Sequence, residues 1–92
     1  MEYKEIRELA IRLAALANPV RLDIVFILSE LGEVSATDLM HEVEVSQPEL
    51  SRHLRMLVAA DVLVVRVAPP YKYYRLSDRA LGHRLVDFWR KN

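Results

Sequence analysis

The chain has 92 residues, of which 52% are hydrophobic and only two are glycine, a composition typical of one small, compact and mainly helical domain. It contains no cysteine, which excludes a disulfide framework, a thiolate metal site and a cysteine nucleophile. The net charge is zero, but residues 1–45 carry four basic and nine acidic side chains and residues 46–92 carry nine and four, so positive charge is concentrated in the second half.

Three helices are predicted in the first half of the chain. Apolar residues recur at helical spacing over about 3–17, which indicates an amphipathic helix. Its stripe includes Ile6, Leu9 and Leu13. Pro19 suits the first turn of a second helix at about 19–31, which is apolar almost all round and ends before Gly32. A capping-box-like spacing then predicts a short third helix at about 36–43.

A longer helix is predicted at about 47–60. Ser46 and Glu49 are spaced as in a capping box, and Pro48 is tolerated in a first turn, so this helix should start sharply. One face carries the apolar residues Leu50, Leu54, Leu57 and Val58. Another face carries short polar and cationic residues, namely Gln47, Ser51, Arg52 and Arg55. This second face indicates either a binding surface or an ordinary solvated helix.

A β-hairpin and a last helix follow. A β-branched run and a tyrosine-rich run, joined by a proline-containing loop, predict two strands at about 62–76. The hairpin carries the charge and amphipathic bulk of Arg66, Lys72 and Tyr73. Ser77 and Asp78 are expected to cap a helix at about 78–91. Its apolar stripe consists of Leu81, Leu85, Phe88 and Trp89.

The order of these elements is that of a single winged helix-turn-helix domain over residues 1–92, mainly α-helical with a small β-hairpin. The major groove of B-DNA admits one α-helix, so the helix at 47–60 can present side chains to base edges while a cationic hairpin reaches phosphates. We therefore expect double-stranded DNA as the partner. The predicted DNA-contacting residues are Gln47, Ser51, Arg52, Arg55, Arg66, Lys72 and Tyr73.

A resemblance to a known family is carried by three segments, which read LANPVRLDIVFIL, VSQPELSRHLRMLVAADVL and YKYYRLS. In order and spacing they resemble the ArsR/SmtB family of bacterial and archaeal transcriptional repressors over about residues 9–77. His53 falls within the second motif, and it either packs in the helix with a polar edge or contacts a phosphate; it is kept among the candidate DNA-binding residues.

The resemblance also implies a homodimer, joined through its first and last helices, that binds a two-fold symmetric operator and blocks transcription. Two recognition helices related by a two-fold axis would enter successive major grooves about 34 Å apart. The alternative is that both apolar stripes pack within one monomer. The predicted dimer residues are Ile6, Leu9, Leu13, Leu81, Leu85, Phe88 and Trp89.

The metal sites of this family do not carry over. Many members sense metals through a cysteine pair in the third helix, where this chain has Ser35 and Thr37, and neutral hydroxyls are poor ligands for soft metals. A second family site on the last helix has Ala80 at the usual histidine position. His83 and Asp87 could meet their symmetry mates, but a surface hydrogen-bonding pair is the favoured interpretation. We predict no metal and no cofactor, and the effector is unknown.

The main alternative function is a winged-helix module that docks a protein and never contacts DNA. Zero net charge and Glu49 favour it slightly, because a carboxylate near phosphates is unfavourable unless it caps its own helix or accepts from a cytosine amino group. An enzyme is not expected, since the sequence suggests no nucleophile–base pair and no glycine-rich phosphate loop.

The sequence also predicts where the protein resides. No uncharged run is long enough to span a bilayer, and the N-terminal segment, which mixes acidic and basic residues, does not resemble a signal peptide. We therefore expect a soluble, cytoplasmic protein with no membrane partner.

Overall fold

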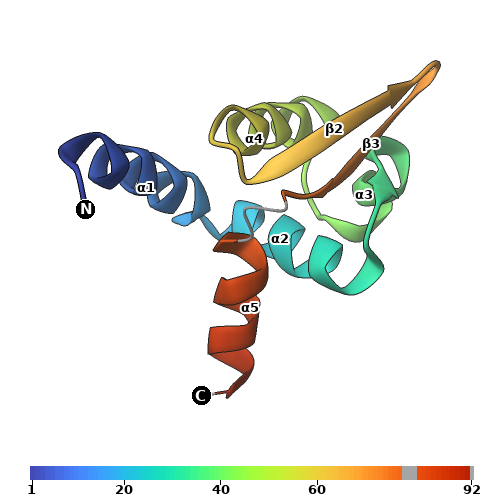
Figure 1. Ribbon diagram of the computed structural model, residues 1–92. Helices are drawn as coiled ribbons and strands as arrows, with labels where there is room; N and C mark the ends of the chain where they lie inside the picture. Colours follow the sequence, from blue (N-terminus) through green and yellow to red (C-terminus); the bar gives the residue numbers. More distant parts are fainter. Residues whose placement is uncertain (78–80, 92) are drawn as a thin grey trace.

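The computed structural model describes residues 1–77 and 81–91 (Figure 1). Within these residues the elements run in the order α1 (Tyr3–Leu16), α2 (Pro19–Leu31), β1 (Val34–Ser35), α3 (Ala36–Glu42), α4 (Gln47–Ala59), β2 (Leu63–Ala68), β3 (Tyr71–Leu76) and α5 (Leu81–Lys91). The observed ends of α1 to α4 and of the hairpin differ from the predicted ones by at most one residue. The predicted start of the last helix, with Asp78 as its cap, lies outside the described residues.

Side-chain caps fix the starts of three helices. The Asn18 side chain accepts from the backbone N–H groups of Val20 and Arg21, at 2.9 and 3.2 Å, and so begins α2. Ser35 caps α3 and Ser46 caps α4 in the same way. The α4 cap differs from the predicted capping box, because the Glu49 carboxylate accepts from the Ser46 hydroxyl at 3.1 Å. Glu49 is thus engaged with its own cap.

The β-structure is larger than the predicted two-stranded hairpin. The antiparallel sheet has the order β1-β3-β2, with β3 in the centre. The predicted hairpin strands pair from Leu63 opposite Leu76 to Ala68 opposite Tyr71. The additional strand β1 pairs Val34 with Tyr74 and Ser35 with Tyr73, and so fixes the start of α3 to the hairpin.

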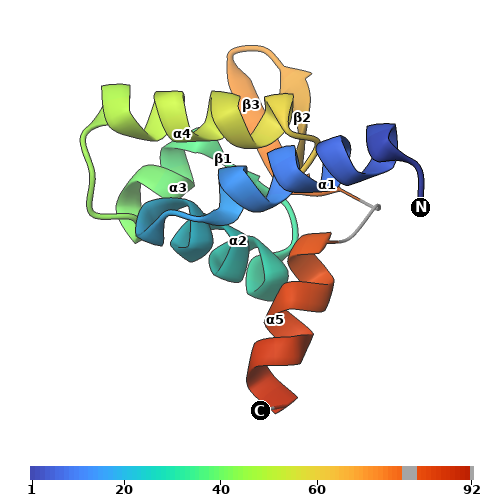
Figure 2. The ribbon, with the colours of Figure 1, turned by 90° about the vertical axis from the view of Figure 1, so that its left-hand side faces the viewer.

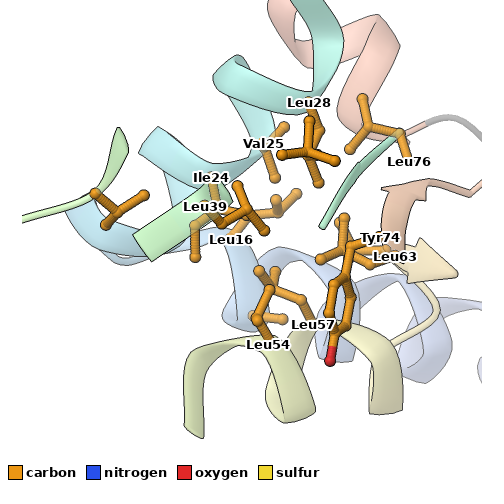
Figure 3. Close-up of a cluster of buried hydrophobic side chains, with 14 of the residues drawn as sticks. Leu16, Ile24, Val25, Leu28, Leu39, Leu54, Leu57, Leu63, Tyr74 and Leu76 are labelled. Carbon is orange, nitrogen blue, oxygen red and sulfur yellow. The ribbon is translucent and has the colours of Figure 1, made fainter. Parts of the chain in front are cut away.

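The core lies between α2, α3, α4 and the base of the sheet (Figure 3). Its most completely buried large side chains include Ile24, Leu28, Leu39, Leu57 and Leu63. They come from α2, α3, α4 and β2, so α2 is the central helix, as its all-round apolar sequence predicts. This arrangement holds the inner face of α4 against the core and leaves its opposite face exposed.

Helices α1 and α5 project from the rest of the fold, with the termini at their free ends (Figures 1 and 2). The base of α5 packs closely on the core, because a Cβ added at Gly82 would lie 3.2 Å from Leu76 Cδ2 and 3.3 Å from Val25 Cγ1. Farther along α5, Arg90 pairs with Glu30 of α2 at 2.6 Å. None of the described helices is long and apolar enough to cross a membrane.

Candidate nucleic-acid interface

The exposed face of α4 brings together the predicted recognition residues. Leu50, Leu54 and Leu57 bury the opposite face in the core, which fixes the rotation of the helix about its axis. The side chains left exposed in the first three turns include Gln47, Ser51, Arg52 and Arg55. A well-anchored helix therefore presents a polar and cationic face to solvent.

A groove of about 450 Å³ runs beside this face, between α3, α4 and β3. Its wall on α4 is formed by Gln47, Ser51 and Arg55, and Lys72 of β3 closes the other side. From α3 it receives Thr37 and His41, which sequence reasoning did not include among the candidates. Their spacing of four residues on a helix places them on one face and is the signal that could have identified them.

A second groove, of about 430 Å³, continues from the first along α4 and the hairpin. The two grooves share Leu54, Arg55, Lys72 and Tyr74, and the second adds the apolar side chains Val58, Ala59, Val65 and Val67. Arg55 and Lys72 therefore lie where a polar and an apolar groove meet. Two cationic side chains, one from a helix and one from a hairpin, thus lie on either side of this junction, as contacts to phosphate groups require.

Arg66 is less available than the sequence suggests. It donates from Nε and Nη2 to the Glu33 carboxylate at 2.7–3.2 Å, and its guanidinium lies 4.5 Å from the centre of the Tyr73 ring. The hydrogen bond from Arg66 lowers the pKa of Glu33 below its ordinary value, so the carboxylate stays charged at neutral pH. Arg66 and Tyr73 thus form a cluster with Glu33 on the wing, and the hairpin's exposed cation beside the grooves is Lys72.

His53 does not lie on the exposed face, which corrects its assignment as a DNA contact. It is buried, with 5% of its surface exposed, and its Nδ1 is 3.2 Å from Arg21 Nη1. Burial first, and then the charge of Arg21, lowers the pKa of His53 below its ordinary value. The packing interpretation is the one that agrees with these contacts.

The predicted dimer residues divide into two groups. Leu81 and Leu85 are half-buried and pack against the chain's own core. The other five expose large apolar surfaces, and these are Ile6, Leu9, Leu13, Phe88 and Trp89. Trp89, with 69% of its surface exposed, is a large apolar side chain of the kind that partner surfaces cover.

The residues considered for metal binding are placed differently from one another. Ser35 is buried and its hydroxyl accepts from the backbone N–H of Asp38, so it serves as a helix cap. His83 and Asp87 are exposed on α5. Across residues 1–77 and 81–91, no group of three or more histidine or carboxylate side chains is arranged to hold a metal ion.

Comparison with known proteins agrees with this geometry. Residues 18–63 match the model of the bacterial regulatory proteins of the arsR family. The chain is 41% identical to the arsenical resistance operon repressor of Escherichia coli K12 over 82% of its own length and 67% of that protein. Its structure resembles HlyU from Vibrio cholerae, with a TM-score of 0.85 and 28% identity, over 97% of this chain and 96% of that one. It also resembles the transcriptional repressor BigR from Xylella fastidiosa, with a TM-score of 0.80 and 30% identity, over 95% and 88% of the two chains.

Proposed function

The chain belongs to the ArsR family of bacterial regulatory proteins, and from this membership we propose that it is a transcriptional repressor that binds double-stranded DNA as a homodimer. It acts in the cytoplasm, where a bacterial chromosome lies, and it catalyses no reaction. The observation that carries the proposal is the exposed face of α4, where Ser51, Arg52 and Arg55 project from a helix whose other face is fixed in the core.

Recognition follows from the dimensions of the helix and of the groove. The N-terminal half of α4 enters the major groove, where an arginine can donate two hydrogen bonds to a guanine and Gln47 can pair with an adenine. Glu49 does not oppose this approach strongly, because its carboxylate accepts from the Ser46 hydroxyl and lies in the first turn of α4, where the helix dipole favours a negative charge. The chemistry of α4 therefore favours specific base contacts.

Phosphate contacts supply orientation and much of the affinity. Arg55 and Lys72 flank the junction of the two grooves, and Thr37 and His41 line the side formed by α3. In helix-turn-helix proteins the first helix of the pair crosses the DNA backbone, which is the position of α3 here. We therefore add Thr37 and His41 to the contacts made by Lys72.

Dimerisation joins two such surfaces. The exposed apolar residues of α1 and α5 would be covered by a second copy, and a two-fold axis would set the recognition helices about one turn of DNA apart. A dimer bound to a promoter would repress transcription by blocking access of the transcription machinery to that DNA. No cofactor is assigned, and the effector is not identified by any residue described above.

The test begins with selection of bound sequences from a random duplex library, followed by fluorescence anisotropy on the selected duplex. Arg52→Ala, which removes a bidentate base contact, and Arg55→Ala, which removes a charge-assisted phosphate contact, are each expected to weaken binding by about ten-fold or more, since each kind of contact contributes roughly 1–3 kcal/mol. Lys91→Ala is the matched control, because Lys91 lies at the far end of α5 from α4 (Figure 2). Selection of no consensus would favour a protein-docking module instead, and equal binding by all variants would contradict the assignment of Arg52 and Arg55 to the DNA-binding face.

A further inference from the structure

Arg21 is a buried cation that the DNA-binding face does not use. It is the third residue of α2 and has 9% of its surface exposed. None of the carboxylates in the described residues forms an ion pair with it. Burial of an unpaired charge is costly, and a cation near a helix N-terminus opposes the helix dipole. Hydrogen bonds from its guanidinium must therefore offset this cost.

The guanidinium joins three helices. Its Nε donates to the carbonyl oxygen of Ala15 at 2.5 Å, near the end of α1, where carbonyls lack helical partners and a cation is favourable. Its Nη1 lies 3.2 Å from His53 Nδ1 and 3.4 Å from Met56 Sδ, both on α4. Residues three apart lie on one side of a helix, so Arg21 holds the inner side of α4.

The contact between Arg21 and His53 also fixes the protonation of the imidazole. A guanidinium has five donors and no acceptor, so Nδ1 of His53 must accept and the ring proton must be on Nε2. A doubly protonated ring would place an N–H against an N–H and two positive charges side by side. The link is therefore formed only with neutral His53.

We propose that Arg21 is a positioning residue for DNA binding, which holds the recognition helix against the end of α1 only while His53 is neutral. This inference rests on the proposed DNA-binding function. Arg52 precedes His53 in the chain and Arg55 precedes Met56. Loss of the contacts from Arg21 to His53 and Met56 would therefore change the orientation of α4 and move both arginines from their positions on the DNA-binding face. Helix α1 also carries the proposed dimer face. Because Arg21 contacts both α1 and α4, it also fixes the orientation of α4 relative to the dimer axis.

The charges around His53 determine the direction of the pH effect. Arg21 of α2 and Arg52 of α4 lower its pKa, after burial, while Glu49 of α4 raises it; α1 contributes the Ala15 carbonyl to the same cluster. Neutral His53 is thus favoured in the fold. DNA affinity is full above the pKa of His53 and is lost as the pH falls through it.

The experiment measures the dissociation constant for the selected duplex from pH 7.5 to 5.5 at constant ionic strength. The parent protein is expected to lose affinity on the acid side, by at most about ten-fold per pH unit for each of the two His53 side chains of the dimer. His53→Asn keeps an acceptor at the Nδ1 position but cannot titrate, so it should bind within about three-fold of the parent at pH 7.5 and lose this pH dependence. Arg21→Met should weaken binding about ten-fold at pH 7.5.

His83→Gln is the matched control, because His83 is exposed on α5, which lines neither of the two grooves beside α4. This control should keep the acid-side loss. An unchanged pH profile in His53→Asn would overturn the inference. So would nitrogen NMR that places the His53 proton on Nδ1, a measurement that needs no DNA and no folded Arg21 variant. A parent protein that binds no duplex at any pH would instead contradict the proposed function.

Discussion

Asn18, Ser35 and Ser46 act locally, because each caps a helix by accepting from backbone N–H groups two or three positions away. The setting of His53 depends instead on a distant residue. Its partner Arg21 is 32 positions away in the sequence, and only the packing of α2 on α4 brings the two together. A histidine next to an arginine on a recognition helix has the same local pattern whether it faces DNA or the core.

The pair of Arg66 and Glu33 shows the same limit, with 33 positions between the partners. The positive charge of the wing could be predicted from the sequence, but its neutralisation by a carboxylate in the turn before β1 could not. Lys72 lies one register position from the pair of Arg66 and Tyr73, opposite Val67, where it is exposed and lines both grooves.

These contacts predict unequal contributions of the basic residues to salt dependence. Arg55→Gln should reduce the slope of log affinity against log salt by about 0.9 per protomer, the value for one lost phosphate contact. Arg66→Gln should leave the slope nearly unchanged, because Arg66 already pairs with Glu33. The measurement is anisotropy over a series of salt concentrations. Glu33→Gln serves as the control, since release of Arg66 should make the slope steeper; equal losses in both arginine variants would contradict the assignment.

At the scale of elements, helical periodicity and caps were sufficient to predict α1 to α4. Apolar residues recur at helical spacing along α1 and α4, and α2 is apolar almost all round, so the sequence pattern of these helices is strong. Strand β1 has only two residues, and its existence depends on pairing with β3, so no local pattern could predict it. Ser35 of this strand is also the cap of α3, and this cap is the signal that the sequence carries in that segment.

Because α5 approaches the core closely at Gly82, a larger side chain at this position should destabilise the protein. Val25 and Leu76 are buried and would have to shift to admit the larger side chain, so Gly82→Val should lower the free energy of unfolding by roughly 1–3 kcal/mol. His83→Val, on the exposed side of the same helix, should change it by less than about 0.5 kcal/mol. Urea unfolding at one protein concentration would measure both. Equal stability of the two variants would mean that α5 does not pack against Leu76.

At the scale of the whole molecule, the fold could be predicted from the order of its elements, and the exposed surface of α1 and α5 gives the reason for dimerisation. A domain of this size buries a limited fraction of its surface, so covering these helices with a second copy adds stability that the monomer lacks. Leu81 and Leu85 show where the sequence was ambiguous, because one apolar stripe serves both the chain's own core and the surface proposed to be covered.

Self-association should therefore depend on one large side chain from each projecting helix. Ile6→Ala combined with Trp89→Ala should raise the dimer dissociation constant by about 100-fold or more, since a buried tryptophan at an interface commonly contributes at least 2 kcal/mol. Sedimentation equilibrium would measure this change. Leu31→Ala is the control, because Leu31 is exposed at the end of α2. A parent that stays monomeric at high concentration, or a double variant that dimerises normally, would contradict the interface.

The central place of β3 leaves the outer edge of β2 without a paired strand in the described sheet. Residues 62–71 contain a single charged side chain, Arg66, in a run rich in valine. An unpaired, β-branched edge can recruit further strands and aggregate, and a charge in its middle discourages this stacking. The guanidinium of Arg66 instead reaches across β3 to Glu33, so this ion pair takes the charge away from the outer edge of β2 and leaves the wing open to the amyloid-like association that its sequence favours.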